Sequence, residues 1–532
     1  MAYCSSYYLY QRYEKRGNQN WLPSYPNVYS IDGEGSQPLR ARKMYDTECG
    51  WIPDEEPIYR WVTIAPSSDP STYVCDDCGL PPTPDPIYRW TNSGTTCIGY
   101  DKYQRVIKQV SYDNGSTWEN VSPVEYSATT LIESDSSDCG YVNPEQMPLT
   151  LIPLENGYFT VGLFDTDASC TVYYSTDSGI TWQSLTLSSA STATIIATTG
   201  NKIMWMGNSH IGDLTFNSTC NYNVEGNVLS LDYGLSNFTG QTSAPNTKYG
   251  GRHNRLFNGS TKLISAKDLL LPHNFSNHSE YLGGGCAYLF RGCTSLTTPP
   301  QLPATTLPES CYAGMFQGCT SLTTPPQLPA TTIAPSCYYF MFAGCTSLTT
   351  APQLPATTIE ERCYMDMFSG CTSLTVAPTL PATTLAESCY NGMFSKCTSL
   401  ITPPQLPATT LSKLCYNAMF EDCSSLTTAP ELPATILKES CYRYMFRKCT
   451  SLAKAPDLTA LTLVSNCYEY MFGGCTNLKY IKCLATDISA SMCTKYWTFN
   501  VSQTGTFVKN NSMSSWPADY DGIPINWTVQ NA

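Results

Sequence analysis

Charged side chains are scarce in this chain, because Asp, Glu, Lys and Arg together make up only 14% of its 532 residues. The basic residues are the scarcer, with 30 Lys and Arg against 43 Asp and Glu, which leaves a net charge of −13. A nucleic-acid-binding surface needs a concentration of positive charge. We therefore expect no nucleic-acid partner. The plentiful Tyr and Pro, 37 of each, favour strands and turns over long charged helices.

Long apolar runs are also missing. No stretch of about 18 consecutive apolar residues occurs, so no membrane span is expected. The first residues, MAYCSSYYLYQRYEKRG, lack a basic segment followed by an apolar one, so we expect no Sec export signal and synthesis in a cytoplasm.

Signatures of catalysis are absent as well. Only four histidines are present, and no P-loop, G-x-S-x-G or H-E-x-x-H motif can be found. No pair of carboxylates stands out either. We therefore expect a protein that is not an enzyme, with no catalytic residues and no cofactor.

One strict repeat stands against these absences. The phrase C-[TS]-[SN]-L begins at Cys293 and recurs every 26 residues, without insertion, as far as Cys475. A fixed period of this size predicts a solenoid. Within each unit, Leu or Ile recurs in the first half, and a motif C-Y-x-x-M-F-x-x-C fills the second half.

The second half of the unit predicts a short helix. Its apolar residues lie at i, i+1, i+4, i+5 and i+8, which share one face of a helix. The conserved-type core positions of the first copies are Met315, Phe316 and Cys319. Pro300 and its equivalents cannot donate to a ladder and should end the strand of each unit. The expected unit is an extended segment, a turn and a short helix, as in an α/β leucine-rich repeat.

Cysteines are numerous, with 26 in the chain. Those of the repeats recur at equivalent positions, and we expect them to be reduced and to act as small buried apolar side chains. Cys75 and Cys78 form a single C-x-x-C. Three interpretations stay open for this pair: structural thiols, a weak zinc site completed by further ligands, or a disulfide.

The N-terminal half predicts β domains. Two segments contain YRW, and two others, SYDNGSTW and STDSGITW, match the Asp-box hairpin. In these, Asp113 and Asp177 would accept hydrogen bonds within the turn, while Trp118 and Trp182 would pack beneath it. Asp boxes resemble those of sialidases, but no arginine triad or Tyr–Glu pair accompanies them, so we expect a structural role.

The whole chain is therefore predicted to be a multidomain protein, in which N-terminal all-β domains precede an α/β solenoid of 26-residue units with a β-rich cap. We place its parts as follows: an N-terminal attachment segment at 1–50, a β-rich domain with the YRW segments and Asp boxes at 51–190, a small β-sandwich at 191–250, the solenoid at 251–492 and the cap at 493–532.

Some positions of the repeat vary freely from unit to unit. They are the two residues between Tyr and Met and the two residues after Phe. Either exposed sites drift without consequence, or this ridge is a binding face, since exposed aromatic and Arg side chains are good anchors. The candidates for receptor binding are Tyr339, Phe340, Arg443, Tyr444, Glu469 and Tyr470.

The motif CY-x-x-MF-x-x-CTSLT-x-x-P-x-LPATTL closely resembles the BspA-like leucine-rich repeats of Bacteroides proteins and their phages, over roughly residues 263–532. The closing segment, LKYIKCLATDISASMCTKYW to WTVQNA, looks like the C-terminal cap of the same proteins. The N-terminal half, with YRW, KQVSYDNGSTW and SSDCGY, is similar to virion-associated proteins of Bacteroides-infecting phages, including crAss-like phages. Members on bacterial surfaces carry a lipoprotein signal, which is not found at the start of this sequence.

These resemblances imply a phage tail fibre, tail spike or head fibre protein that resides in the virion. The N-terminal half would then attach to other virion proteins, and the solenoid would contact a glycan or protein of the host surface; a homo-oligomer is expected. Two alternatives remain: a bacterial surface adhesin of the BspA-like type, and a glycan hydrolase built on the Asp-box region.

Overall fold

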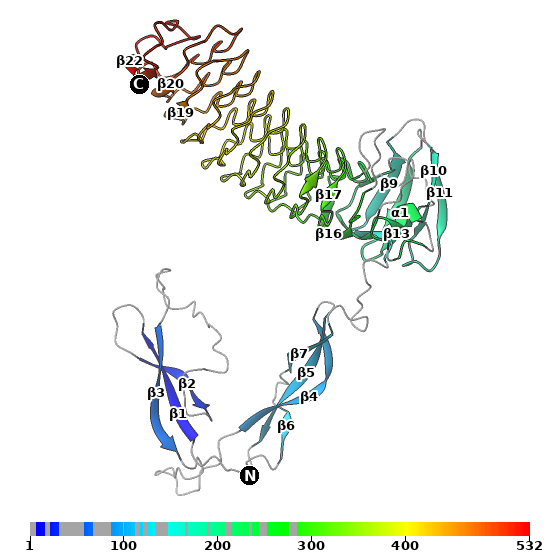
Figure 1. The fold of residues 1–532 in the computed structure, drawn as a ribbon. Coiled ribbons are helices and arrows are strands. Elements are labelled where there is room, and N and C mark those ends of the chain that lie inside the picture. Colours follow the sequence, from blue (N-terminus) through cyan, green and yellow to red (C-terminus); the bar gives the residue numbers. More distant parts are fainter. Residues whose placement is uncertain are drawn as a thin grey trace. The chain divides into compact units, whose positions relative to one another are not determined.

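The chain divides into two compact units, Met1–Tyr141 and Val142–Ala532, in the computed structural model (Figure 1). In the first unit the structure describes residues 7–15, 22–30, 58–67, 87–98, 101–111, 117–120 and 126–133. In the second it describes residues 147–532, with gaps at 165–168, 189–190, 208–213, 234–236, 240, 244–252 and 276–284.

The first unit contains two antiparallel sheets. Their orders are β2-β1-β3 and β4-β5-β6, with β7 pairing β5 as well. Both YRW segments lie in strands, one at the start of β3 and one at the start of β4. The bounds are β1 (Tyr7–Lys15), β2 (Leu22–Ser30), β3 (Ile58–Ser67), β4 (Ile87–Ile98), β5 (Asp101–Ser111), β6 (Glu119–Asn120) and β7 (Tyr126–Glu133).

The second unit begins with two further sheets, one of six strands in the order β11-β10-β13-β8-β15-β16 and one of three in the order β12-β9-β14. Buried aromatic pairs join them: Phe159 meets Tyr222 and Trp205 meets Phe216, each with ring centroids 4.9 Å apart. The bounds are β8 (Leu149–Pro153), β9 (Gly157–Leu163), β10 (Ser169–Ser175), β11 (Gln183–Ser188), β12 (Ala193–Ala197), β13 (Ile203–Met206), β14 (Leu214–Ser218), β15 (Tyr222–Asn227) and β16 (Leu263–Leu270). These strands cross the domain boundaries predicted at 190 and 250.

The solenoid continues directly from the six-stranded sheet. Strand β16 pairs in parallel with β15, and Ser265 on its other edge bridges Thr298 of the next coil. Residues 253–275 therefore form a first coil, which the 26-residue spacing does not reveal because Phe257 precedes its equivalent Phe290 by 33 residues. Leu149 to Trp527 belong to one continuous buried core.

The predicted α/β repeat is wrong, because the structure is a β-solenoid of turns of about 26 residues. Its strands are short: β17 (Thr306–Leu307), β18 (Thr332–Ile333), β19 (Lys454–Leu458), β20 (Tyr480–Cys483), β21 (Thr506–Lys509) and β22 (Thr528–Asn531). The only helix in the described parts of the chain is α1 (Ser230–Tyr233), which lies outside the solenoid.

The segment predicted as a helix is a series of four-residue turns. From residue 310 to 318 the backbone N–H groups alternate in direction. Those of Tyr312 and Gly314 donate to the next coil, at Cys337 and Tyr339, whereas those between them donate to the carbonyl three residues earlier. Every fourth residue has a positive φ, as at Ser310, Gly314 and Gly318. Apolar pairs spaced by four residues point inward in such turns as well as in a helix, so the spacing alone could not separate the two.

Stacked aromatic columns fill the core. The Phe rings from Phe257 to Phe472 follow one another with centroids 5.5–5.8 Å apart, and the Tyr rings from Tyr312 to Tyr468 lie 5.7–6.2 Å apart. Met315, Phe316 and Cys319, predicted as core, are fully buried. Trp497 receives both columns at the cap, 6.1 Å from Tyr468 and 6.2 Å from Phe472, and its indole N–H donates to the carbonyl of Gly522.

Candidate binding face of the solenoid

The varied positions between Tyr and Met form a continuous column along the solenoid. The second residue of each pair has a φ between 52° and 62° in every coil. This conformation costs roughly 1–2 kcal/mol for a residue with a Cβ, yet most coils place a larger residue than Gly there. The column consists of Arg255, Tyr288, Gly314, Phe340, Asp366, Gly392, Ala418, Tyr444, Tyr470 and Tyr496.

Sequence reasoning missed Arg255, Tyr288 and Tyr496 as members of this column. Arg255 and Tyr288 precede Leu-Phe-x-Gly, just as Gly314 precedes Met-Phe-x-Gly. That short pattern is the signal that could have found them, and the irregular spacing of the first coils obscured it.

In the C-terminal half the varied residues contact one another. The Arg443 guanidinium lies 2.7 Å from the carboxylate of Glu469, 26 residues later, whose side chain is only 6% exposed. The Tyr444 ring lies 5.3 Å from Tyr470, and Tyr470 lies 5.0 Å from Tyr496. Four of the six predicted receptor-binding residues are therefore brought together, and they are engaged with equivalent positions of the next coil.

Other pairs follow the same 26-residue step. The side chains of Glu421 and Arg447 form an ion pair, as do Asp422 and Lys448 at 3.5 Å. The Asn417 amide donates to Asn391, at 2.9 Å. The varied residues of these coils are thus matched between neighbours, which neither free drift nor a purely external binding role had anticipated.

The N-terminal half of the face is hollowed instead. Tyr339 and Phe340, the other two candidates, pack ring against ring at 4.2 Å. Beside Tyr339 runs a groove of about 570 Å³ that passes over several coils. Its lining consists of Ala287, Tyr288, Glu309, Ser310, Ala313, Ser336, Tyr339, Arg362, Met365, Ser388, Asn391 and Leu414.

Gly314 shapes the N-terminal end of this groove. A Cβ at Gly314 would lie 2.3 Å from Cε1 of Tyr288, so the ring of Tyr288 lies directly over the glycine. The Arg255 and Arg291 guanidinium groups lie 5.5 and 5.6 Å from the same ring. A small floor at Ala313 and Gly314 between larger residues of the coils on either side leaves the hollow.

Asp366 has the most unusual carboxyl of the face. Burial raises its pKa from 3.8 to about 6, and nearby Lys396 opposes the rise. Its carboxylate fills the place that a side chain would take at Gly392, since a Cβ there would lie 2.2 Å from Oδ1 of Asp366.

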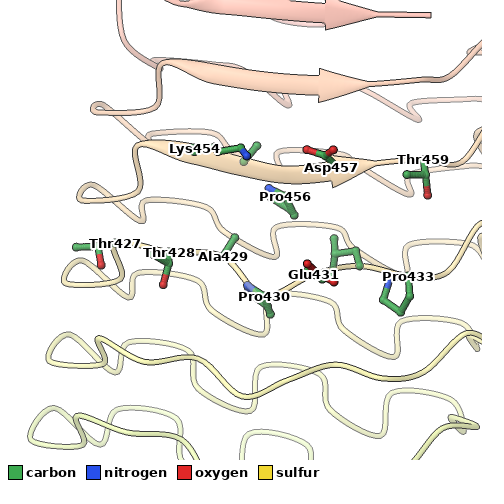
Figure 2. Close-up of a pocket in the computed structure, with 12 residues that line it drawn as sticks. Thr427, Thr428, Ala429, Pro430, Glu431, Pro433, Lys454, Pro456, Asp457 and Thr459 are labelled. Carbon is green, nitrogen blue, oxygen red and sulfur yellow. The ribbon is translucent and has the colours of Figure 1, made fainter. Parts of the chain in front are cut away.

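A second hollow lies on the proline face, between two coils (Figure 2). Thr427, Thr428 and Pro430 line one side, and Lys454, Pro456 and Asp457 line the other. Pro430 and Pro456 have no N–H to donate across the gap. Asp457 is already paired with Lys482 at 2.7 Å. No aromatic side chain lines this hollow, so it lacks the anchors of the varied face.

The turn at Asp177 is closed by its own side chains. The Asp177 carboxylate accepts hydrogen bonds from the N–H and hydroxyl of Thr181 and from the hydroxyl of Ser175, and these bonds lower its pKa to about 2. Trp182 donates to the carbonyl of Gly179. Asp113 lies outside the described residues, whereas Trp118 is half-buried beneath the Arg89 guanidinium, 4.1 Å from its ring.

The repeat cysteines have no chemistry available to them. The Cys319 thiol donates to the carbonyl of Phe290 at 3.1 Å, and its equivalents do the same in later coils. Burial raises the pKa of Cys345 to about 12. Cys75 and Cys78 lie outside the described residues, and within those that are described no group of three or more His, Cys, Asp or Glu side chains is placed to hold a metal ion.

Comparison with known families decides what the repeats are. Residues 286–427 and 387–513 match the family model of the BspA type leucine-rich repeat region. The solenoid is a BspA-type leucine-rich repeat region. No curated protein and no solved structure shows a significant match to the chain. Among the residues that the structure describes, no helix is long and apolar enough to cross a membrane.

Proposed function

We propose that the chain is a structural and receptor-binding protein of a phage particle, a tail or head fibre or spike component. Its N-terminal half would attach to other virion proteins, and the BspA-type solenoid would contact a glycan or protein of the host surface. Residence in the virion and a homo-oligomeric state belong to the same proposal, and no catalysis is part of it.

One observation carries this proposal. The buried columns of the solenoid hardly change from coil to coil, while one outer face varies and retains aromatic side chains in a strained backbone conformation. A rigid rod with a varied aromatic face suits recognition, because preorganised aromatic anchors lose little entropy on binding. The sequence resemblance of the N-terminal half to phage virion proteins supports the particle as its location.

Two experiments test the proposal. Mass spectrometry of purified particles should detect the chain in stoichiometric amount, and the purified chain should bind intact host cells. Absence from the particles would remove the phage assignment. Detection in the outer membrane of uninfected cells would instead favour the bacterial surface adhesin.

The Asp-box assignment remains a proposal of its own. The hydrogen bonds of Asp177 and Trp182 support a structural hairpin turn rather than a hydrolase site, since each polar group is used within the turn. Release of reducing sugar from host capsule, abolished by Asp177→Ala in a chain that still folds, would support the hydrolase alternative.

A further inference from the structure

The groove on the N-terminal half of the varied face is long and follows the solenoid axis. One wall is built by residues of a single column, including Ala313, Tyr339 and Asn391, which are 26 or 52 residues apart and so lie in successive coils. The opposite wall is built in the same way by Ser310, Ser336 and their equivalents. Because each wall repeats with the coils, the groove fits a linear, repeating ligand better than a compact one.

The groove's polar groups are hydroxyls and an amide. Ser310, Ser336 and Ser388 supply hydroxyls, and Asn391 supplies an amide that both donates and accepts. Tyr288 and Tyr339 add aromatic rings to the same walls. A sugar ring has apolar C–H faces and a rim of hydroxyls, and this combination matches aromatic rings beside small hydrogen-bonding side chains.

The charges at the groove favour an uncharged ligand. Glu309 and Arg362 are the charged residues of its lining, and Arg362 already pairs with Glu361 at 3.1 Å. Asp366 lies next to the lining residue Met365. An acidic polymer would therefore meet carboxylates here and find its one cation engaged.

An extended peptide finds no backbone partners in the groove wall. Each backbone N–H from Ser310 to Gly318 already donates within the chain, either to the next coil or within its own turn. A peptide that adds to a sheet needs a row of free backbone groups. Side-chain hydroxyls remain available, and these suit a carbohydrate.

We propose that this groove binds a neutral oligosaccharide that lies along the solenoid axis, with sugar rings against Tyr288 and Tyr339. The inference rests on the proposed function and names the ligand class of its receptor contact. The backbone supports it too, because Tyr288 adopts φ 57° where the next coil uses Gly, and strain that a glycine would relieve is retained most often at functional surfaces.

The test is a glycan array probed with the labelled full-length chain. The array should carry neutral oligosaccharides (glucans, mannans, xylans and galactans) beside uronate-containing and sulfated ones. We expect binding to one neutral class, followed by titration calorimetry with that oligosaccharide. Tyr288→Ala and Tyr339→Ala should each weaken affinity about tenfold or more. The matched control is Tyr520→Ala, which removes an exposed tyrosine of the cap and should change affinity less than about twofold.

Each other outcome overturns the inference. Binding only to anionic glycans, no glycan binding, or equal loss in Tyr520→Ala would each do so, once thermal unfolding has shown that the variants fold. Binding of the chain to host cells separates the two proposals. Cell binding that persists without glycan binding, and is lost when the cells are treated with protease, removes the oligosaccharide but keeps the receptor-binding function. No cell binding at all removes the function itself.

Discussion

At the scale of single residues, Asp366 makes the solenoid sensitive to pH. Its pKa is raised to about 6 in the folded chain by burial, above the 3.8 of an exposed aspartate. A group whose folded pKa is raised stabilises the fold when protonated, and that contribution is lost as pH rises from about 4 through about 6. Asp366→Asn should therefore raise the melting temperature at pH 7.5 and change it little at pH 4. An equal effect at both pH values would contradict the assignment.

Arg443 illustrates a residue whose role the sequence misjudged. As an exposed position of the repeat it was expected to tolerate Arg443→Ala without loss of stability. Its partner Glu469 is almost buried, however, so removing the guanidinium leaves a carboxylate without its cation. Because Arg443 is itself about one-third exposed, we expect a loss of about 1–2 kcal/mol in the free energy of unfolding. Adding Glu469→Gln should restore part of it, as chemical denaturation of the single and double variants would show.

Phe368 is the internal comparison for Arg443. It is fully buried in the middle of the Phe column, 5.7 Å from both neighbouring rings. Phe368→Ala should cost about 3–5 kcal/mol, since the gap cannot close between fixed coils. The same denaturation series measures it. A loss no larger than that of Arg443→Ala would contradict the division into an inside and an outside.

At the scale of the element, one coil is a row of turns whose glycines have two separate reasons to be glycine. Gly318 has a φ of 74° and nothing nearer than 3.8 Å to an added Cβ, whereas Gly314 has a φ of 57° and the ring of Tyr288 above it. Gly318→Ala should cost about 1 kcal/mol for conformation alone. Gly314→Ala should cost more, because the ring must move.

A double variant checks this reasoning. In the background of Tyr288→Ala the added cost of Gly314→Ala should fall to that of Gly318→Ala, when urea denaturation is compared across the set. An unchanged cost would show that the tyrosine does not press on the glycine.

The coil also shows what sequence could and could not predict. The period, the inward Leu, Phe, Cys and Met positions and the role of Trp497 at the cap follow from the repeat, because burial constrains those residues in every copy. The helix did not survive, since apolar pairs four residues apart fit both a helix and a row of turns. Pairs such as Arg443 with Glu469 depend on which residues lie 26 apart on the same face, and they become visible only once the coils are stacked. The groove depends on Ala313 and Gly314 lying between larger neighbours for the same reason.

At the scale of the whole molecule, the continuous core predicts that most thiols are protected. Of 26 cysteines, 20 are buried and unpaired in the described part of the chain, which leaves 26 − 20 = 6 elsewhere. Because the thiolate is the reactive form and burial disfavours it, at most six thiols should react with a thiol reagent at pH 8 before denaturant is added. The buried ones should react together as unit Val142–Ala532 unfolds. Rapid titration of more than six in native buffer would contradict this.

The single ring of Trp497, at the end of both aromatic columns, means that the repeat itself contains no instruction to stop. Every coil offers its successor the same Phe and Tyr platform, so the number of coils is a property of where the cap was placed and not of the coil. Reach can then change by whole coils during evolution while the ends stay constant, as the length of a ruler changes without new markings. The matched charges between neighbours limit where such a cut is tolerated: a coil can be gained or lost where small residues meet, and less easily between Glu421 and Arg447.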